Sequence, residues 1–209
     1  MTGKFVTFEG TDGSGKTSVI NGLSTRLDRL GLHGKYLVTR EPGGSRISEA
    51  IREVILDKRN IMMDKKTEAL LYAASRRQHL VERVLPSLSA GMLVLCDRFV
   101  DSSLAYQGAA RGVGVSEVAA INRFATDGLK PDLTFYFDMD PEVGLQRIRT
   151  SRQDEVNRLD EEKIDFYQKV RSEYLELVHD DPDRIKVVDA TQSESEVEAK
   201  VFSQLKKYL

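Results

Sequence analysis

The chain has 209 residues and a mass of 23.5 kDa, which is the size of one domain. Its residues are 40% apolar and 31% charged, a composition that is typical of a soluble globular protein and argues against global disorder. With 31 Lys and Arg against 33 Asp and Glu, the net charge is −2, so the overall charge gives no reason to expect a polyanion-binding protein. The lone Cys96 cannot form an internal disulfide, and the sequence shows neither a signal-peptide pattern nor a membrane-length apolar run. We therefore expect one cytoplasmic domain over residues 1–209. A secreted, membrane or zinc-finger protein is disfavoured.

Five short and nearly continuous apolar runs predict β-strands that are buried on both faces. In chain order, the strands are expected at Phe5–Phe8, Tyr36–Val38, Met92–Cys96, Leu133–Phe137 and Ile185–Val188. Segments of helical period separate them, and such alternation is typical of a parallel sheet with right-handed crossovers. We expect an α/β fold, a five-stranded parallel sheet with helices on both faces, whose ligands bind at the carboxyl ends of the strands.

The predicted helices are marked by apolar stripes and by end signals. The first stripe consists of Val19, Ile20, Leu23, Leu27 and Leu30, and Gly31 stops it. The second consists of Ile47, Ile51, Val54 and Ile55, and the third of Leu70, Ala73, Leu80 and Val84 on a helix expected to end near Pro86. Asp140-Pro141 predicts a capped helix start, and Ser193 with Glu196 has the spacing of a capping box.

The strongest motif is Gly10-Thr-Asp-Gly-Ser-Gly15-Lys16-Thr17, which matches the phosphate-loop pattern G-x-x-x-x-G-K-[ST] between the first strand and the first helix. Its glycines permit backbone angles that let successive N–H groups and the helix N-terminus face one anion. Lys16 would add a charge for the β- and γ-phosphates, and Thr17 a hydroxyl for Mg²⁺. The motif predicts a nucleoside triphosphate with Mg²⁺, and it leaves GTPase, kinase and motor readings open.

A second polar strand end is Asp97-Arg98, directly after the apolar run Met92–Cys96. An Asp at this place can hold Mg²⁺, directly or through water, and Arg98 can hold a phosphate as a bidentate fork. A strand-terminal Asp can also simply cap the next turn. Opposite a complete phosphate loop, the Mg²⁺ role is favoured.

Three segments could hold a phosphoryl acceptor, although each alone is a weak signal. Tyr72 and Arg76 are four residues apart and share a helix face, where a ring could stack on a nucleobase and a guanidinium could donate to its carbonyl edge. Asp101–Gln107 could supply directional hydrogen bonds to a base and a sugar. Thr39–Gly44 places charges and a rigid Pro at a strand end.

A cluster of arginines predicts a lid over the transferring phosphate, approximately residues 146–159. Arg147, Arg149, Arg152 and Arg158 lie in a stretch without apolar periodicity. Preorganised guanidinium groups neutralise the charge that spreads over the equatorial oxygens, and closure excludes water. A solvated surface turn is the alternative. The lid is favoured because the phosphate loop carries no Arg of its own.

Taken together, these motifs resemble the thymidylate kinase (dTMP kinase) family of the bacterial type over essentially the whole chain. The resemblance rests on Phe-Glu-Gly-x-Asp-Gly-Ser-Gly-Lys-Thr, Arg-Glu-Pro-Gly-Gly, Tyr-Ala-Ala-Ser-Arg, Asp-Arg-Phe-x-Asp-Ser-Ser-x-Ala-Tyr-Gln-Gly and the Arg-bearing lid. It implies a P-loop nucleoside monophosphate kinase fold and the reaction ATP + dTMP → ADP + dTDP with Mg²⁺, in support of dTTP synthesis. It also implies a homodimer. From the balanced charge and the lack of a membrane-length apolar run, we expect neither a nucleic-acid nor a membrane partner.

The resemblance further implies a role for each matching position. The catalytic residues implied are Lys16, Arg98, Arg152 and Asp12, and the metal residues are Thr17 and Asp97. The ATP-binding residues implied are Gly10, Thr11, Asp12, Gly13, Ser14, Gly15, Lys16, Thr17, Ser18 and Arg147. The dTMP-binding residues implied are Asp12, Glu41, Arg52, Tyr72, Arg76, Arg98, Ser103, Tyr106 and Gln107, with Arg40 near the acceptor phosphate. By the resemblance, Tyr72 would stack on thymine, Arg76 would donate to its carbonyl, and Tyr106 would disfavour ribonucleotides. Among the catalytic residues, Arg152 would mark the subgroup whose basic residue sits in the lid.

Three alternatives to a dTMP kinase differ in testable ways. A kinase for another nucleoside monophosphate would prefer another acceptor in an ADP-release assay. A GTPase switch would need a guanine-reading Asn-Lys-x-Asp, and the sequence contains no Asn-Lys pair. A non-catalytic nucleotide-binding module would bind without turnover, and intact Lys16, Asp97 and lid arginines argue against it.

Overall fold

The structure is a computed structural model that describes residues 3–151 and 162–209. Its strands are β1 Lys4–Gly10, β2 Tyr36–Arg40, β3 Leu93–Asp97, β4 Leu133–Asp138 and β5 Ile185–Asp189. They form one sheet in the order β2-β3-β1-β4-β5, and every neighbouring pair is parallel. The predicted five-stranded parallel sheet is therefore confirmed.

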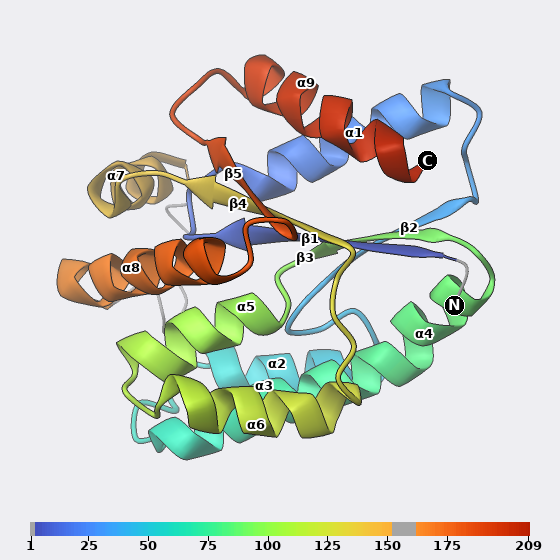
Figure 1. Cartoon of the computed structure of the whole chain (residues 1–209). Coiled ribbons are helices and arrows are strands. Elements are labelled where there is room, and N and C mark those ends of the chain that lie inside the picture. The colour runs from blue at the N-terminus through green and yellow to red at the C-terminus, as the bar shows by residue number, and fades with distance from the viewer. Residues whose placement is uncertain (1–2, 152–161) are drawn as a thin grey trace.

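The helices cover both faces of this sheet (Figure 1). The α-helices are α1 Lys16–Arg29, α2 Arg46–Leu56, α3 Lys65–His79, α4 Leu85–Ser89, α5 Val100–Ser103, α6 Val115–Thr126, α7 Pro141–Ser151, α8 Ile164–Asp180 and α9 Glu194–Leu205. The described residues also form two π-helical segments, η1 Leu80–Val84 and η2 Leu104–Ala110, and a 3₁₀ turn, η4 Lys206–Tyr208. In Figure 1, α1 and α9 lie on one side of the sheet, and α3 to α6 lie on the other. No helix in these two ranges is both long and apolar enough to cross a membrane.

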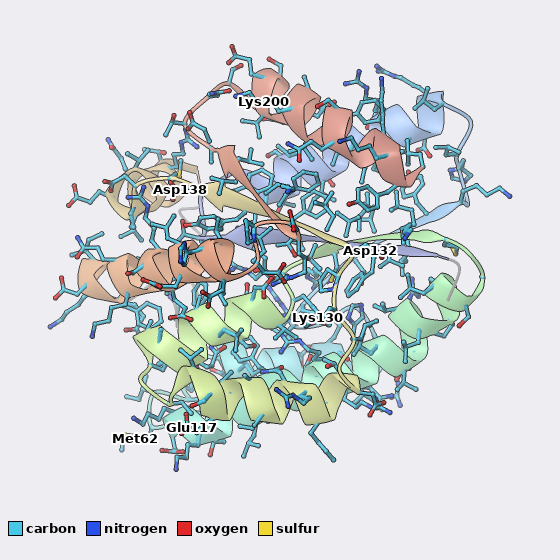
Figure 2. The ribbon with its side chains drawn as sticks, in the orientation of Figure 1. Met62, Glu117, Lys130, Asp132, Asp138 and Lys200 are labelled. Atoms are coloured by element: carbon cyan, nitrogen blue, oxygen red, sulfur yellow. The ribbon has the colours of Figure 1, made fainter. Side chains whose placement is uncertain are left out.

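The core follows the alternation of side chains along the strands. Val6 and Phe8 of β1 point toward α1 and α9, where they join one buried apolar cluster. Phe5, which directly precedes Val6, points to the opposite face and packs with a cluster that includes Val84 and Phe99. Both faces of a central strand are thus buried, which explains its continuous apolar run. Asp138, labelled in Figure 2 at the end of β4, accepts two hydrogen bonds from Arg171 and ties α8 to this edge.

Two parts of the sequence-based prediction are wrong about burial. β2 and β5 are the edge strands, so side chains such as Val38 (39% exposed) and Val187 (49%) remain partly open to solvent. On α2, only Ile55 of the predicted apolar stripe is buried, while Ile47 and Val54 are exposed. The helical spacing of apolar residues in the sequence shows that one face of a helix is apolar, but it does not show that another element covers that face.

The helix that was expected to end near Pro86 continues to Ser89. The π-helical segment η1 lies just before Pro86, which occupies the first turn of α4. Pro lacks an N–H, and the first turn of a helix is where that N–H would have no partner anyway. The two predicted helix starts are confirmed: Asp140 accepts from the Glu142 N–H, and Ser193 forms a capping box with Glu196.

Candidate active site

The phosphate loop connects β1 to α1 at the carboxyl edge of the sheet. Gly13 and Gly15 have φ of +78° and +83°, a region that side chains rarely adopt. A Cβ at Gly13 would also lie 2.4 Å from the carbonyl oxygen of Gly144 on α7. The loop therefore packs against α7 only because this position has no side chain.

Lys16 starts α1, and its side chain folds back over the loop. Its Nζ donates to the carbonyl oxygens of Gly10 (3.1 Å) and Thr11 (2.8 Å) and to Ser14 Oγ (3.2 Å). Burial, followed by the charge of Arg98, lowers the pKa of Lys16 to about 8. Three members of the predicted ATP-binding set thus hold the ammonium group.

The two predicted metal residues lie together. Thr17 Oγ1 donates to Asp97 Oδ2 at 3.0 Å, across the gap between α1 and the end of β3. The other carboxylate oxygen, Asp97 Oδ1, is buried and has no hydrogen-bond partner among the described residues. A hydroxyl beside an unpartnered carboxylate oxygen is a donor set that suits a hard divalent cation such as Mg²⁺.

Arg98 follows Asp97 with a φ of +68°, which is uncommon for a residue with a side chain. Its N–H donates to the carbonyl of Phe8 at 2.9 Å, so the turn is fixed to β1. Its guanidinium donates to Asp12 Oδ1 (3.0 Å) and lies 5.0 Å from the centre of the Tyr106 ring. Neighbouring groups including Tyr106 and Asp12 raise the pKa of Arg98 despite its burial, so the group stays cationic.

A donor-side cleft opens over the phosphate loop. Its wall includes Asp12, Gly13, Gly15, Lys16, Thr17, Ser18, Asp97, Arg98, Arg147 and Thr150. Gly10, Thr11 and Ser14 do not line it, because their polar atoms face Lys16 instead. Arg147 reaches this cleft from α7 and donates to the carbonyl of Ala190 at 3.1 Å. The predicted Arg152 lies outside the described residues.

The sequence analysis missed a neighbouring cleft that shares Gly15 and Arg147 with the donor cleft. Its other lining residues are Ser14, Val19, Ala190, Thr191, Gln192, Ser193, Glu194 and Val197. Residues 190–194 follow β5, so they lie at the carboxyl edge where ligands of parallel sheets bind. Residues 190–194 could have been predicted from the sequence, because they follow the last expected strand and ligands bind at the carboxyl ends of parallel strands.

An acceptor-side cavity lies on the other side of Arg98. It is lined by Asp12, Glu41, Pro42, Arg52, Leu56, Tyr72, Arg76, Arg98, Ser102, Ser103, Tyr106 and Gln107. Every residue of the predicted dTMP-binding set is among them. Arg40 is not, and it pairs instead with Glu49 of α2 at 2.9 Å. Asp12 and Arg98 line both this cavity and the donor cleft, so the two spaces adjoin.

Arg76 is far more buried than a helix-surface pair suggests, since only 2% of it is exposed. Its Nε donates to Glu41 Oε2 at 2.6 Å, and its Nη2 donates to the Phe99 carbonyl at 2.9 Å. Its Nη1 donates to Ser103 Oγ and to Asn122 Oδ1. Four of the five N–H groups of the guanidinium are thus engaged, and one on Nη2 has no partner in the described part of the chain.

Glu9 is a buried acid behind the site that the sequence analysis did not single out. It accepts hydrogen bonds from the Phe99 N–H (2.7 Å), from Ser102 Oγ and from Tyr174 Oη (2.9 Å). Ser102 also accepts from Arg98, so it links Glu9 to the guanidinium. Burial, followed by the charge of Asp101, raises the pKa of Glu9 to about 7. The sequence feature that could have singled out Glu9 is its position: an acidic residue near the end of a strand that is predicted to be buried on both faces.

We expect Glu9→Gln to change how stability depends on pH. The folded protein keeps the Glu9 proton up to about pH 7, whereas the unfolded chain releases it near pH 4.5. Wild type should therefore lose roughly 2–3 kcal/mol of stability, relative to the variant, as pH rises through this window. Urea unfolding at pH 5 and pH 7.5 measures the difference, with exposed Glu176→Gln as the control. Parallel curves for wild type and Glu9→Gln would contradict the prediction.

Comparisons with known proteins agree with this geometry. A family model described as Thymidylate kinase matches residues 8–201. The thymidylate kinase of Ligilactobacillus salivarius (strain UCC118) is 59% identical over 193 residues, which cover 92% of each chain. That of Enterococcus faecalis (strain ATCC 700802 / V583) is 56% identical over 209 residues, covering 100% of this chain and 98% of its own. The crystal structure of thymidylate kinase from Ehrlichia chaffeensis superposes with a TM-score of 0.79 at 30% identity and covers 99% of both chains.

Proposed function

The chain belongs to the thymidylate kinase family and phosphorylates dTMP, and we propose that it forms one kinase domain over residues 1–209. In this domain, we propose that ATP binds in the donor cleft and dTMP binds in the acceptor cavity. The observation that carries this assignment is the shared wall of the two spaces, formed by Asp12 and Arg98. Phosphoryl transfer needs the donor and acceptor phosphates in line and adjacent. Family membership sets the GTPase and non-catalytic alternatives aside.

On the donor side, the phosphate loop binds the triphosphate and Lys16 neutralises its β- and γ-oxygens. The missed cleft around Arg147 and residues 190–194 continues from the loop and suits the adenine end of ATP. Arg147 is fixed there through its bond to Ala190. The guanidinium plane can pack on a base, and the backbone of residues 190–194 offers polar groups to its edge.

On the acceptor side, the cavity separates base, sugar and phosphate recognition. Tyr72 and Arg76 contact the base, with Ser103 and Gln107 at its polar edge. Tyr106, held under Arg98, crowds the sugar and disfavours a 2′-hydroxyl. Arg52 and Arg98 hold the acceptor phosphate, and Glu41 positions Arg76.

No side chain has to act as a strong base, because the acceptor phosphate is already anionic. The protein contributes positioning and charge neutralisation through Lys16, Arg98 and Asp12, which orients Arg98. We assign the remaining cation to the lid, in Arg152, because the loop Gly10–Thr17 contains no Arg. On this proposal, the chain belongs to the lid-arginine subgroup of the family.

Mg²⁺ would be held by Thr17 and Asp97, whose paired oxygens fit it. When bound, the ion neutralises charge on the donor phosphates. We expect Asp97→Asn to raise the Mg²⁺ concentration for half-maximal rate at least about tenfold, since one anionic ligand is lost. A Mg²⁺ titration at saturating ATP and dTMP measures the shift. An unchanged half-maximal concentration would remove Asp97 from the metal site.

An ADP-release assay tests the proposed substrates directly. The acceptors dTMP, UMP, dCMP, AMP and dGMP are compared at fixed ATP and Mg²⁺. We expect dTMP to have the highest kcat/KM, and preference for a purine would contradict the assignment of the acceptor cavity. Slow hydrolysis of GTP without an acceptor would instead favour a switch protein.

The protein is also proposed to be a cytoplasmic homodimer. Ile47 and Val54 on α2 and Leu70 and Val81 on α3 and η1 are 44–55% exposed, and α2 packs against α3. Exposed apolar side chains grouped on packed helices are typical of an interface. Sedimentation at micromolar concentration should give about twice the chain mass, and a monomer would contradict this. The single buried thiol, Cys96, suits a reducing compartment.

A further inference from the structure

Glu68, on α3, lies behind the acceptor cavity and contacts the amide of Gln107. Its Oε1 accepts a hydrogen bond of 2.9 Å from Gln107 Nε2, and the two residues are only 1% and 2% exposed. Arg111 donates to the same oxygen at 3.3 Å and also pairs with Glu162. In this ion pair, Glu68 is a carboxylate and offers only acceptors. The NH₂ group of Gln107 must therefore turn toward Glu68.

Fixing the NH₂ group also fixes the carbonyl oxygen of the same amide. Gln107 lines the acceptor cavity, and its Oε1 has no hydrogen-bond partner within residues 3–151 and 162–209. With Nε2 held by Glu68, Oε1 is the group that Gln107 presents to a ligand. Without a partner that only accepts, an amide can present either its oxygen or its nitrogen.

Arg76 supplies the opposite polarity on the same wall. One N–H of its Nη2 remains available, since its other four donors are engaged. A donor from Arg76 beside an acceptor from Gln107 complements a carbonyl next to a ring N–H, which is the imide edge of thymine. Cytosine has an amino group and a bare ring nitrogen there, so donors would face donors and acceptors would face acceptors.

We propose that Glu68 is a positioning residue that makes the acceptor cavity select thymine over cytosine by holding the Gln107 amide in one orientation. The inference rests on the proposed placement of dTMP in this cavity. Glu68 itself does not line the cavity, so it acts through Gln107. Arg111 supports it by keeping an acceptor-only group at this position.

The test compares kcat/KM for dTMP and dCMP in wild type, Glu68→Gln and Glu68→Asp. A Gln at position 68 can donate or accept, so Gln107 can turn either way. We expect the dTMP:dCMP ratio to fall at least about tenfold in Glu68→Gln. Glu68→Asp keeps a group that only accepts and should keep the ratio. The KM for ATP should be unchanged in both, and exposed Glu176→Gln on α8 is the control.

A double variant separates positioning from a general structural effect. In a Gln107→Leu background there is no amide to orient, so Glu68→Gln should cause no further change in the ratio. If thermal melting shows that Glu68→Gln does not fold, Glu68→Met takes its place, because Met has a similar length and no strong acceptor for the Gln107 NH₂ group. An active Glu68→Gln or Glu68→Met variant with the wild-type dTMP:dCMP ratio would overturn this inference. Failure of wild type to use dTMP would instead overturn the proposed function.

Discussion

Replacing Lys16 with Ala should lower kcat by about 10²–10³-fold, because a fixed cation is removed from the place where charge develops on the transferring phosphate. The ammonium group is already held by Gly10, Thr11 and Ser14, so little rearrangement is needed when the phosphates bind. Loss of such a preorganised charge acts on the transition state more than on substrate binding. The KM values for ATP and dTMP should therefore change less than kcat.

The measurement is steady-state ADP release at saturating substrates, with urea unfolding to confirm the fold. Lys200→Ala is the matched control, since Lys200 is exposed on α9 (Figure 2) and lines none of the clefts described above. Lys16→Arg should recover little activity, because a planar guanidinium does not fit the contacts of a compact ammonium group. A kcat within fivefold of wild type in Lys16→Ala would refute the role of this lysine.

Replacing Arg76 with Met should lower both the free energy of unfolding and the kcat/KM for dTMP. The variant would leave Glu41, 4% exposed, without its guanidinium partner at 2.6 Å. Breaking a buried ion pair from one side costs about 3–5 kcal/mol. Loss of the base-contacting donor should also lower kcat/KM for dTMP by at least about 100-fold, with little change in the KM for ATP.

The neighbouring Arg77 provides a matched control for Arg76. It pairs with Asp127, and these side chains are 45% and 75% exposed. Solvent weakens such a pair, so Arg77→Met should cost less than about 1 kcal/mol. Urea unfolding of both variants compares the two sites. Equal stability of the two variants would contradict the buried pair, and an unchanged KM for dTMP in Arg76→Met would contradict base recognition.

Features that depend on neighbouring residues along the chain were predictable from the sequence. The phosphate loop is one uninterrupted segment, so its glycines, Lys16 and Thr17 identify their own geometry. The capping box at Ser193 and the start at Asp140 are equally local, and both formed as expected. Five apolar runs predicted five strands, and the family resemblance supplied all the lining residues of the acceptor cavity except Pro42, Leu56 and Ser102.

Features that depend on which elements become neighbours were decided by the tertiary structure. The order β2-β3-β1-β4-β5 leaves β2 at an edge, and an apolar stripe on α2 does not reveal that Ile47 faces outward. Arg76 is buried by Glu41 and Asn122, which lie 35 and 46 residues away in the chain. Glu9 and Glu68 acquire their roles in the same way.

The sequence by itself thus determined the parallel α/β plan, the donor loop and the family. Only the folded chain decided the acceptors around Arg76, the raised pKa of Glu9, the orientation of the Gln107 amide and the contact between the two proposed substrate spaces. The physical reason is that a hydrogen bond or a desolvation penalty depends on distances of a few ångströms between groups far apart in sequence. Local periodicity carries no information about such distances.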